Sequence, residues 1–461
     1  MIKKINWNLL KPNKELEYGL EIMKIINDLG YESLIVGGYV RNILLNKNPN
    51  DVDISTNCPQ EKIEKLFNTL EVGKSFGVTI VKYKGFIFEV SQYRSDIYNN
   101  FDKGKGANTV KFVSTFKEDS KRRDFTINSL GVDYNGNIYD YHNGREDIKN
   151  KIIRTVGNPY IRFKEDYLRL IRAIRFSSIL EMTIHSDTYI AIENNASNIL
   201  NVSNERITAE IFKMANQSGK RFALSINLLK EIGLLDYIMP EISVMDSFEH
   251  SKEHHPEGNV LVHTLRALEE NYNGGVLQNL CILYHDIGKT VTYNYVDEKI
   301  TYHQHDRKGI KLIEGIAKRD KWDNTTKDAV QFCALNHMKV HYILNMKKNK
   351  IIKLMNSPYW KLLLCTSYTD EKCRMYLFDE KLWNKKMEKI NSINKKYSNQ
   401  ENDALTSIKN IVNGKLVMKI KEFTEPSKRI GDIIQQTITW ITDNDINLED
   451  TKKIEQYIKS L

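Results

Sequence analysis

Two aspartates one residue apart, Asp51 and Asp53, are the residues of this chain best suited to hold a metal ion. In a strand, residues i and i+2 point to the same side, so both carboxylates would converge on one spot. They would repel each other there unless a cation lay between them. Hard oxygen ligands suit Mg²⁺, which also takes oxygens from substrate phosphates. Upstream, Gly37 and Gly38 would let a phosphate approach the backbone, and Arg41 follows them. The combination predicts nucleotidyl transfer; the alternative is an Asp-rich turn after an ordinary strand.

A third acid, Glu89, lies in the strand-like run 86–90 between apolar neighbours. If this strand neighbours the one that carries Asp51 and Asp53, Glu89 would join the metal site. From the local pattern alone, a solvent-facing strand glutamate is an equally good interpretation.

The string 122–128 contains two arginines followed by Asp124 and Asn128. The planar guanidinium fork of Arg123 donates hydrogen bonds in pairs and so suits phosphate oxygens. Asp124 and Asn128 would bind ribose hydroxyls or orient the arginines. The alternative is a solvated cluster of ion pairs.

Asp166, Arg169 and Arg172 would share one face of a helix, because they are spaced i, i+3, i+6. A carboxylate accepts from the exocyclic amine that cytosine and adenine both carry, and a guanidinium donates to the neighbouring ring nitrogen. Uracil and guanine would leave unpaired acceptors. One Asp–Arg pair would therefore accept C and A; the alternative is a salt bridge on a wet surface.

Nine of the eleven histidines fall between His250 and His341. The dipeptide His285-Asp286, with the earlier His263 and the later Asp370, resembles the HD phosphohydrolase superfamily. The resemblance implies that these four residues hold a divalent metal that activates water. The alternative is a body that only binds RNA. Three other histidines in this stretch would be ligands of a second metal, residues behind the first ligands, or polar surface: His303, His305 and His337.

The composition bounds the class of protein. A chain of 461 residues suggests two to four domains, and its net charge of +9 fits a polyanionic partner. Five scattered cysteines without C-x-x-C spacing suggest free thiols. Because no apolar run approaches a membrane span and no signal peptide is visible, we expect a soluble cytoplasmic protein without a membrane partner. No obligate protein partner is evident.

The predicted secondary structure changes along the chain. Short β-rich runs separated by helical patches occupy residues 34–140, and nearly every segment from residue 162 onward has the pattern of an amphipathic helix. We therefore predict an α+β fold with a mixed sheet in an N-terminal head, followed by an all-α neck, body and tail. The predicted domains are a head over 1–145, a neck over 146–240, an HD body over 241–378 and a tail over 379–461.

The ordered motifs resemble the bacterial class II tRNA nucleotidyltransferase and poly(A) polymerase family of the DNA polymerase beta superfamily. The matching segments are Gly37-Gly38 to Arg41 with Asp51-x-Asp53, 73–77, 89–94, Arg122 to Asn128, Asp140 to Gly144, Glu165-Asp166-x-x-Arg169, and Glu205-Arg206-Ile207 with Glu210. The resemblance implies addition of C, C and A to the 3′ end of tRNA from CTP and ATP, without a nucleic-acid template. It implies Mg²⁺ on Asp51 and Asp53, and a loop at 102–108 that takes part in the change from C to A.

A basic turn at 425–431 opens a helical run near the C-terminus. The family's tail contacts the tRNA elbow at a similar turn, which implies that Lys428 and Arg429 bind RNA, as Arg206 of the neck motif would. The alternative is a capped helix with exposed basic side chains.

Three alternative functions stay open. One is a poly(A) polymerase, or an enzyme that adds only CC or only A. The second is a metal-dependent phosphohydrolase acting on RNA ends, and the third is a non-catalytic RNA-binding protein.

Overall fold

The computed structural model groups the chain into two compact units. The first comprises residues 1–244, 272–276 and 317–322, and the second comprises 245–271, 277–316 and 323–461. The structure describes residues 4–7, 13–49, 51–70, 77–98, 109–250, 256–297, 299–398, 408, 411–444 and 446–461. The family-like segment at 73–76 and the loop at 102–108 lie outside the described residues.

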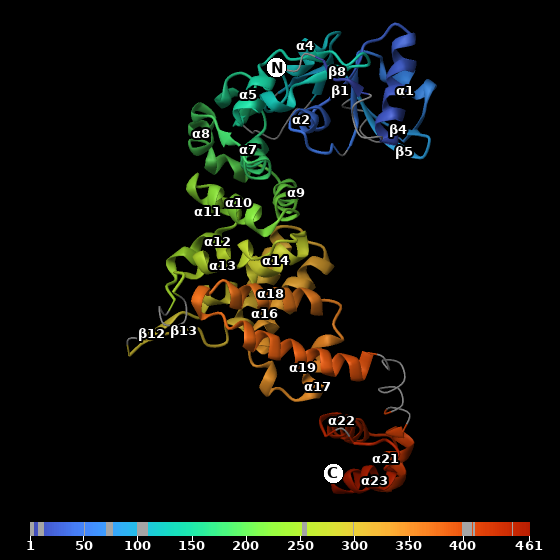
Figure 1. Ribbon diagram of the computed structural model, residues 1–461, viewed down its shortest axis with the longest axis vertical. Coiled ribbons are helices and arrows are strands. Elements are labelled where there is room, and N and C mark those ends of the chain that lie inside the picture. The colour runs from blue at the N-terminus through green and yellow to red at the C-terminus, as the bar shows by residue number, and fades with distance from the viewer. Residues whose placement is uncertain are drawn as a thin grey trace. The chain divides into compact units, whose positions relative to one another are not determined.

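A mixed sheet forms the centre of the head (Figure 1). Its strand order is β3-β4-β5-β2-β1-β8-β9, and the pair β2–β5 is parallel while its other pairs are antiparallel. The strands of this sheet are β1 (Ser33–Val36), β2 (Asp53–Thr56), β3 (Asn68–Leu70), β4 (Val78–Tyr83), β5 (Phe86–Gln92), β8 (Gly131–Asp133) and β9 (Ile138–Tyr139). A separate hairpin pairs β6 (Arg94–Ile97) with β7 (Thr109–Phe112), and β10 (Ile152–Ile153) pairs with β11 (Thr183–Ile184).

The sheet is central because its middle strands are buried on both faces. All four residues of β1 are buried, as are three of the four in β2. Helix α1 (Lys14–Asp28) begins where the Asn13 side chain accepts from the backbone N–H of Glu15, and it buries one apolar stripe. The other head helices are α2 (Gly38–Leu44), α3 (Gln60–Leu66), α4 (Phe116–Ser120) and α5 (Gly144–Asn150).

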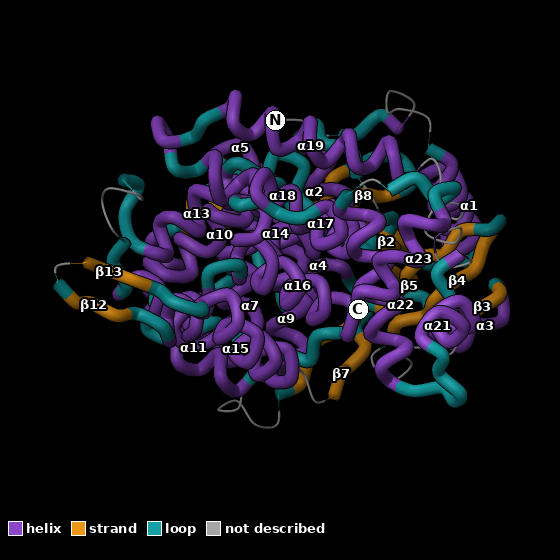
Figure 2. Tube along the Cα trace, turned by 90° about the horizontal axis from the view of Figure 1, so that it is seen from below, coloured by secondary structure: helices purple, strands orange, loops and turns teal. Residues whose placement is uncertain are grey.

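After β10, the first unit is mostly helical (Figure 2). Helix α7 is its best-buried helix, since Leu170, Ile171 and Ile174 are fully covered. The helices are α6 (Pro159–Glu165), α7 (Leu168–Leu180), α8 (Ser186–Glu193), α9 (Asn204–Ala215), α10 (Gly219–Glu231), α11 (Leu235–Ile238) and α12 (Pro240–Ser243).

The second unit is a helical body with one small hairpin, β12 (Asn294–Val296) with β13 (Lys299–Thr301). Its helices are α13 (Val260–Glu269), α14 (Val276–Tyr284), α15 (His305–Arg319), α16 (Asn324–His341), α17 (Lys348–Met355), α18 (Trp360–Lys372), α19 (Glu380–Ser398), α21 (Gly414–Lys421), α22 (Lys428–Asp443) and α23 (Thr451–Ser460). The last three helices share an apolar cluster, in which Ile430, Ile433 and Ile458 are buried.

The predicted α+β head followed by helices is confirmed. The predicted domain limits stay predictions. Helix α19 bears on the limit at residue 378, because its Trp383 ring lies 5.1 Å from that of Tyr368 in α18 and its Lys386 pairs with Glu371. No helix among the described residues is long and apolar enough to cross a membrane.

Candidate nucleotide-transfer site and candidate metal centre

Three acids lie close together at two neighbouring central strands of the head sheet, β2 and β5. Asp53 opens β2 and lies in register with Glu89 of the parallel neighbour β5, and Asp51 precedes the strand by two residues. Burial, together with the nearby charges of Glu89 and Asp51, raises the pKa of Asp53 to about 7. Such a carboxylate gains from a cation between the three acids, so this donor set fits Mg²⁺.

Gly37 forms the sharp turn between β1 and α2. Its φ of +66° and ψ of −129° belong to a conformation that only glycine adopts without strain. A Cβ at this position would lie 3.8 Å from Arg123 Nη1, and one at Gly38 would lie 3.5 Å from Arg41 Nη2. The turn therefore brings bare backbone close to two guanidinium groups, as a phosphate cradle requires.

A buried aspartate that the sequence interpretation missed, Asp119, fixes the arginine pair. Its carboxylate accepts from Arg122 at 3.0 Å and from Arg123 at 3.1 Å, and its side chain is fully covered. Burial acts to raise the pKa of Asp119, but Arg123 and Arg122 outweigh it and hold the pKa below its ordinary value. The i, i+3, i+4 spacing of Asp119, Arg122 and Arg123, which begins in α4 and continues past its end, was the signal that could have identified it.

Asp124 joins the head to helix α7. Its carboxylate accepts from Arg172 at 2.5 and 2.9 Å and from Asn128 Nδ2 at 3.1 Å. Burial acts to raise the pKa of Asp124, yet the charge and hydrogen bonds of Arg172 lower it to about 2. Arg41 donates to Asn128 Oδ1 at 2.6 Å, so these predicted nucleotide-binding residues form one connected network.

The prediction that Asp166 shares a helix with Arg169 is wrong. Asp166 ends α6 in extended backbone, with φ −157° and ψ 105°, and its side chain accepts from the N–H of Leu168 as α7 begins. The physical reason is the preference of aspartate for capping a helix over lying inside it.

The side chains of Asp166 and Arg169 each form an ion pair with a different residue. Arg206 donates to both oxygens of Asp166, at 3.2 and 2.7 Å, while Arg169 donates to Glu165 at 2.5 Å. Arg206, predicted to bind RNA, therefore orients a predicted base-selecting carboxylate. Arg169 also donates to the carbonyl of Arg122 at 3.1 Å, which ties α7 to the arginine pair.

All the predicted residues of the head line one cavity of about 670 Å³. Its lining has nine basic side chains (Arg41, Arg94, Arg122, Arg123, Arg169, Arg172, Arg175, Arg206 and Lys213) and six acidic ones (Asp51, Asp53, Glu89, Asp96, Asp124 and Asp166). The excess of positive charge fits a triphosphate, and Asp51, Asp53 and Glu89 fit its metal.

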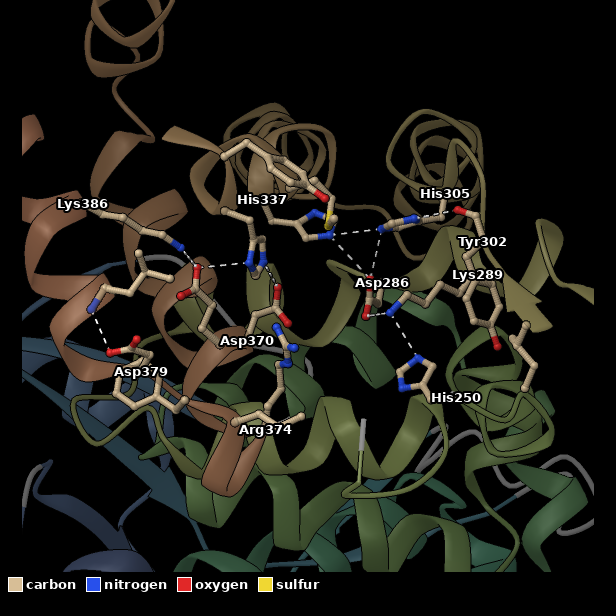
Figure 3. A pocket seen from close by; sticks show the side chains of 18 of the residues that line it. His250, Asp286, Lys289, Tyr302, His305, His337, Asp370, Arg374, Asp379 and Lys386 are labelled. Carbon is tan, nitrogen blue, oxygen red and sulfur yellow. Dashed lines mark hydrogen bonds and ion pairs between the residues drawn. The ribbon is translucent and has the colours of Figure 1, made fainter. Parts of the chain in front are cut away.

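A second cavity of about 570 Å³ lies in the helical body (Figure 3). Beside it, Asp370 Oδ1 lies 3.1 Å from His263 Nε2, and Asp286 Oδ2 lies 3.3 Å from His285 Nε2. The four predicted ligands are thus brought together, and each is at most 5% exposed. Glu257, which the sequence interpretation missed, contacts His263 Nδ1 at 2.6 Å and so orients its ring.

Lys428 and Arg429 are exposed at the start of α22, which follows Ser427. The Arg429 guanidinium lies 5.9 Å from the centre of the Phe423 ring. Their place at a helix N-terminus leaves both side chains available to a phosphate.

Comparison with known proteins finds two matching family models within the first 245 residues. Residues 33–154 match the family model described as the poly A polymerase head domain. Residues 181–245 match the model of the probable RNA and SrmB-binding site of polymerase A. The chain is therefore similar to poly A polymerases over these two segments. Both family segments fall within the first unit, except for residue 245.

Curated proteins that the chain is similar to are named CCA-adding enzymes. The one from Lactobacillus johnsonii is 40% identical over 211 residues, which are 45% of this chain and 52% of the relative. The one from Geobacillus thermodenitrificans is 38% identical over 230 residues, 50% of this chain and 55% of the relative. The chain spans about half the length of the curated relatives it matches.

Solved structures extend the likeness of fold to nearly the whole chain. The Bacillus stearothermophilus CCA-adding enzyme in complex with CTP has a TM-score of 0.72 at 24% identity and covers 98% of both chains. The Thermotoga maritima CCA-adding enzyme complexed with tRNA has a TM-score of 0.59 at 17% identity, covering 98% of this chain and 96% of its own. At these identities the likeness establishes the fold.

Proposed function

We propose that this protein adds C, C and A to the 3′ end of tRNA, without a template, from CTP and ATP. The observation that carries the proposal is the register of Asp53 with Glu89 on the neighbouring strand. Together with Asp51, these two acids line a cavity that arginines also line. The relatives named as CCA-adding enzymes support it. So do the structures of CCA-adding enzymes in complex with CTP and with tRNA, whose fold this chain shares.

In this proposal Asp51 and Asp53 hold Mg²⁺, with Glu89 as a third acid. The metal supplies activation of the terminal 3′-hydroxyl and neutralises triphosphate charge. Arg123 and Arg41 bind phosphate oxygens beside the Gly37-Gly38 turn, and Asp124 and Asn128 hold the ribose. No covalent enzyme intermediate is needed, because positioning and charge neutralisation carry the reaction.

Base selection falls to the network at the start of α7. Asp166 accepts from the exocyclic amine of cytosine or adenine, with its carboxylate oriented by Arg206. Arg169 donates to the adjacent ring nitrogen, and Arg172 holds Asp124 in place. Because Arg206 and Glu165 pair with these side chains in the structure described, a bound nucleobase must share or exchange those partners. Lys428 and Arg429 contact the tRNA backbone at the tail.

The decisive experiment supplies tRNA transcripts that end at the discriminator base, at C and at CC, with each nucleoside triphosphate separately, and reads the 3′ ends. The proposal predicts C addition to the first two and A addition only to the third. A run of A on every substrate would show a poly(A) polymerase, and addition of C alone or of A alone would show a partial enzyme.

A second activity, hydrolysis of phosphate esters at RNA ends, is proposed for the body. It is favoured by the convergence of His263, His285, Asp286 and Asp370 on one buried point, a donor set that suits a divalent transition metal. The proposal predicts that hydrolysis of a 2′,3′-cyclic phosphate survives Asp53→Ala and is lost in Asp286→Ala. Hydrolysis that depended on Asp53 would place this activity in the head.

A further inference from the structure

Helix α1 holds the backbone between the two aspartates of the head site. The N–H of Val52 donates to Glu15 Oε1 at 3.2 Å. Glu15 lies in the first turn of α1, where its own N–H donates to the Asn13 side chain at 2.9 Å. A side chain from a capped helix turn therefore reaches the residue that separates Asp51 from Asp53.

The Val52 side chain is held against the same helix. It is 2% exposed, and a Cβ added at Gly19 of α1 would lie 2.8 Å from Val52 Cγ1. The same Cβ would lie 3.5 Å from Phe88 of β5, beside which α1 packs (Figure 1). Glu15 and Gly19 are spaced i, i+4 and so share one face of α1. Both the backbone and the side chain of Val52 are thus held by this face.

Asp51 depends on this support because the sheet does not reach it. Strand β2 begins at Asp53, which lies in register with Glu89 of β5, and the pairing of β2 with β1 begins at Ile54. Asp51 lies before the strand and is exposed. An ion bound by both aspartates requires a fixed distance between their carboxylates, and Val52 is the residue that links them.

We propose that Glu15 is a positioning residue for nucleotidyl transfer, whose bond to the Val52 N–H sets Asp51 against Asp53 in the geometry that binds Mg²⁺. The inference rests on the proposed function of the head. Glu15 acts through the backbone of Val52 and not as a metal ligand. Its bond is charge-assisted, which makes it stronger than a bond between neutral groups.

The competing explanation is that Glu15 only serves α1. An acid in the first turn of a helix interacts favourably with the helix dipole, and Glu17 is a second acid in that turn. The two explanations differ for glutamine, whose amide oxygen accepts from the Val52 N–H but carries no charge for the dipole. They also differ at Glu17, which is exposed and carries the same charge.

The first measurement is amide hydrogen exchange at Val52 in the metal-free full chain, which depends on neither metal nor activity. Glu15→Ala removes the acceptor, so exchange at Val52 should become at least about tenfold faster. Glu15→Gln keeps an acceptor and Glu17→Ala is the matched control, so both should stay within about threefold of the parent.

The second measurement is the affinity of the head for Mn²⁺, which carboxylates bind as they bind Mg²⁺. Free Mn²⁺ is counted by its resonance in an Asp286→Ala background, in which the head is expected to be the remaining site. Glu15→Ala should weaken the affinity about 10- to 100-fold, as loss of a residue that orients metal ligands typically does. Glu15→Gln should restore most of the affinity, and Glu17→Ala should match the parent.

A third variant tests the same support from the other contact. Gly19→Ala places a methyl group against Val52, whose β-branched side chain has little freedom to give way. It should weaken the affinity for Mn²⁺ in a protein whose circular dichroism matches the parent. Where Glu15→Ala does not fold, parental Mn²⁺ affinity in Gly19→Ala would overturn the proposal.

Three other results would overturn it. Unchanged exchange at Val52 in Glu15→Ala would show that the bond does not hold this residue in solution. Faster exchange with unchanged Mn²⁺ affinity would limit Glu15 to a structural part. Equal losses of affinity in Glu15→Ala, Glu15→Gln and Glu17→Ala would assign the effect to the helix dipole. A parent that binds Mn²⁺ through Asp51 and Asp53 but adds no nucleotide would refute the proposed function and leave the positioning of these ligands by Glu15 standing.

Discussion

The head cavity and the body cavity offer a cation different types of ligand. The head places carboxylates at central strands of its sheet, in a cavity that arginines also line, and Asp51 and Glu89 remain exposed. The body places imidazoles and carboxylates in a buried cluster, with His263 and His285 at most 1% exposed. Hard, open oxygen ligands suit a hydrated Mg²⁺ that arrives with its nucleotide, and buried nitrogen ligands suit a resident transition metal. The difference predicts two metal-dependent reactions that can be removed separately.

The largest expected effect separates the two sites. Asp53→Asn keeps the size of the side chain and removes the charge, so nucleotide addition should fall at least about 10³-fold through loss of metal binding. The measurement is extension of end-labelled tRNA, with tRNA affinity as the control for folding. Addition within threefold of the parent, roughly 0.6 kcal/mol, would remove Asp53 from the metal site.

A smaller effect is expected at the base-selecting carboxylate. Asp166→Ala removes the acceptor for the exocyclic amine, so the preference for CTP over UTP should fall about 10- to 100-fold. The comparison is kcat/KM for the two nucleotides on the same tRNA. Arg206→Lys, which keeps a charge but not the paired hydrogen bonds, should lie between the parent and Asp166→Ala. An unchanged preference in Asp166→Ala would place base selection elsewhere.

The direction in which Mg²⁺ affinity changes with pH tests the metal site of the head. Because burial raises the pKa of Asp53 to about 7, a proton competes with Mg²⁺ below that pH. Affinity for Mg²⁺ should therefore rise about tenfold per pH unit up to near pH 7 and then level off. A pKa above the unfolded value also means that the metal-free head loses stability as pH rises from about 4 to about 7.

Calorimetry in an Asp286→Ala background would measure both the Mg²⁺ affinity and the stability of the head as a function of pH. That variant is used because its body is expected to hold no ion. Asp53→Asn is the matched control, because it has no proton to release. A profile that is flat in both proteins would contradict the assignment.

The smallest effect is expected at the tail. Lys428→Ala with Arg429→Ala should raise the KM for tRNA several-fold and reduce the salt dependence of tRNA binding by about 0.7 to 0.9 per lost phosphate contact. The affinity for CTP should not change, because both residues lie in the second unit and the head cavity is lined by the first. A change in CTP affinity alone would refute their proposed contact with RNA.

Local spacing predicted the parts of both sites that depend on one element. The α+β head could be predicted from alternating short runs, and Asp53 and Glu89 from their place in strands, whereas Asp51 lies two residues before β2. What spacing could not predict is pairing between elements. Arg206 reaches Asp166 over 40 residues, and Arg172 reaches Asp124 over 48. Such partners are fixed by helix packing, which no local pattern encodes.

The error at Asp166 has the same origin. A spacing of i, i+3, i+6 is compatible with one helix, but the sequence gives no measure of where one helix ends and the next begins when a capping residue lies between them. In the body, His305 and His337 were recognisable as metal-ligand types, yet only the fold brings them to the second oxygen of Asp286.

The most direct test of the account is to sequence the 3′ ends of tRNA made by two variants, Asp53→Ala and Asp286→Ala, from transcripts that lack CCA. The account predicts complete CCA ends from Asp286→Ala and unextended ends from Asp53→Ala. CCA ends from Asp53→Ala, or their loss in a folded Asp286→Ala, would contradict it.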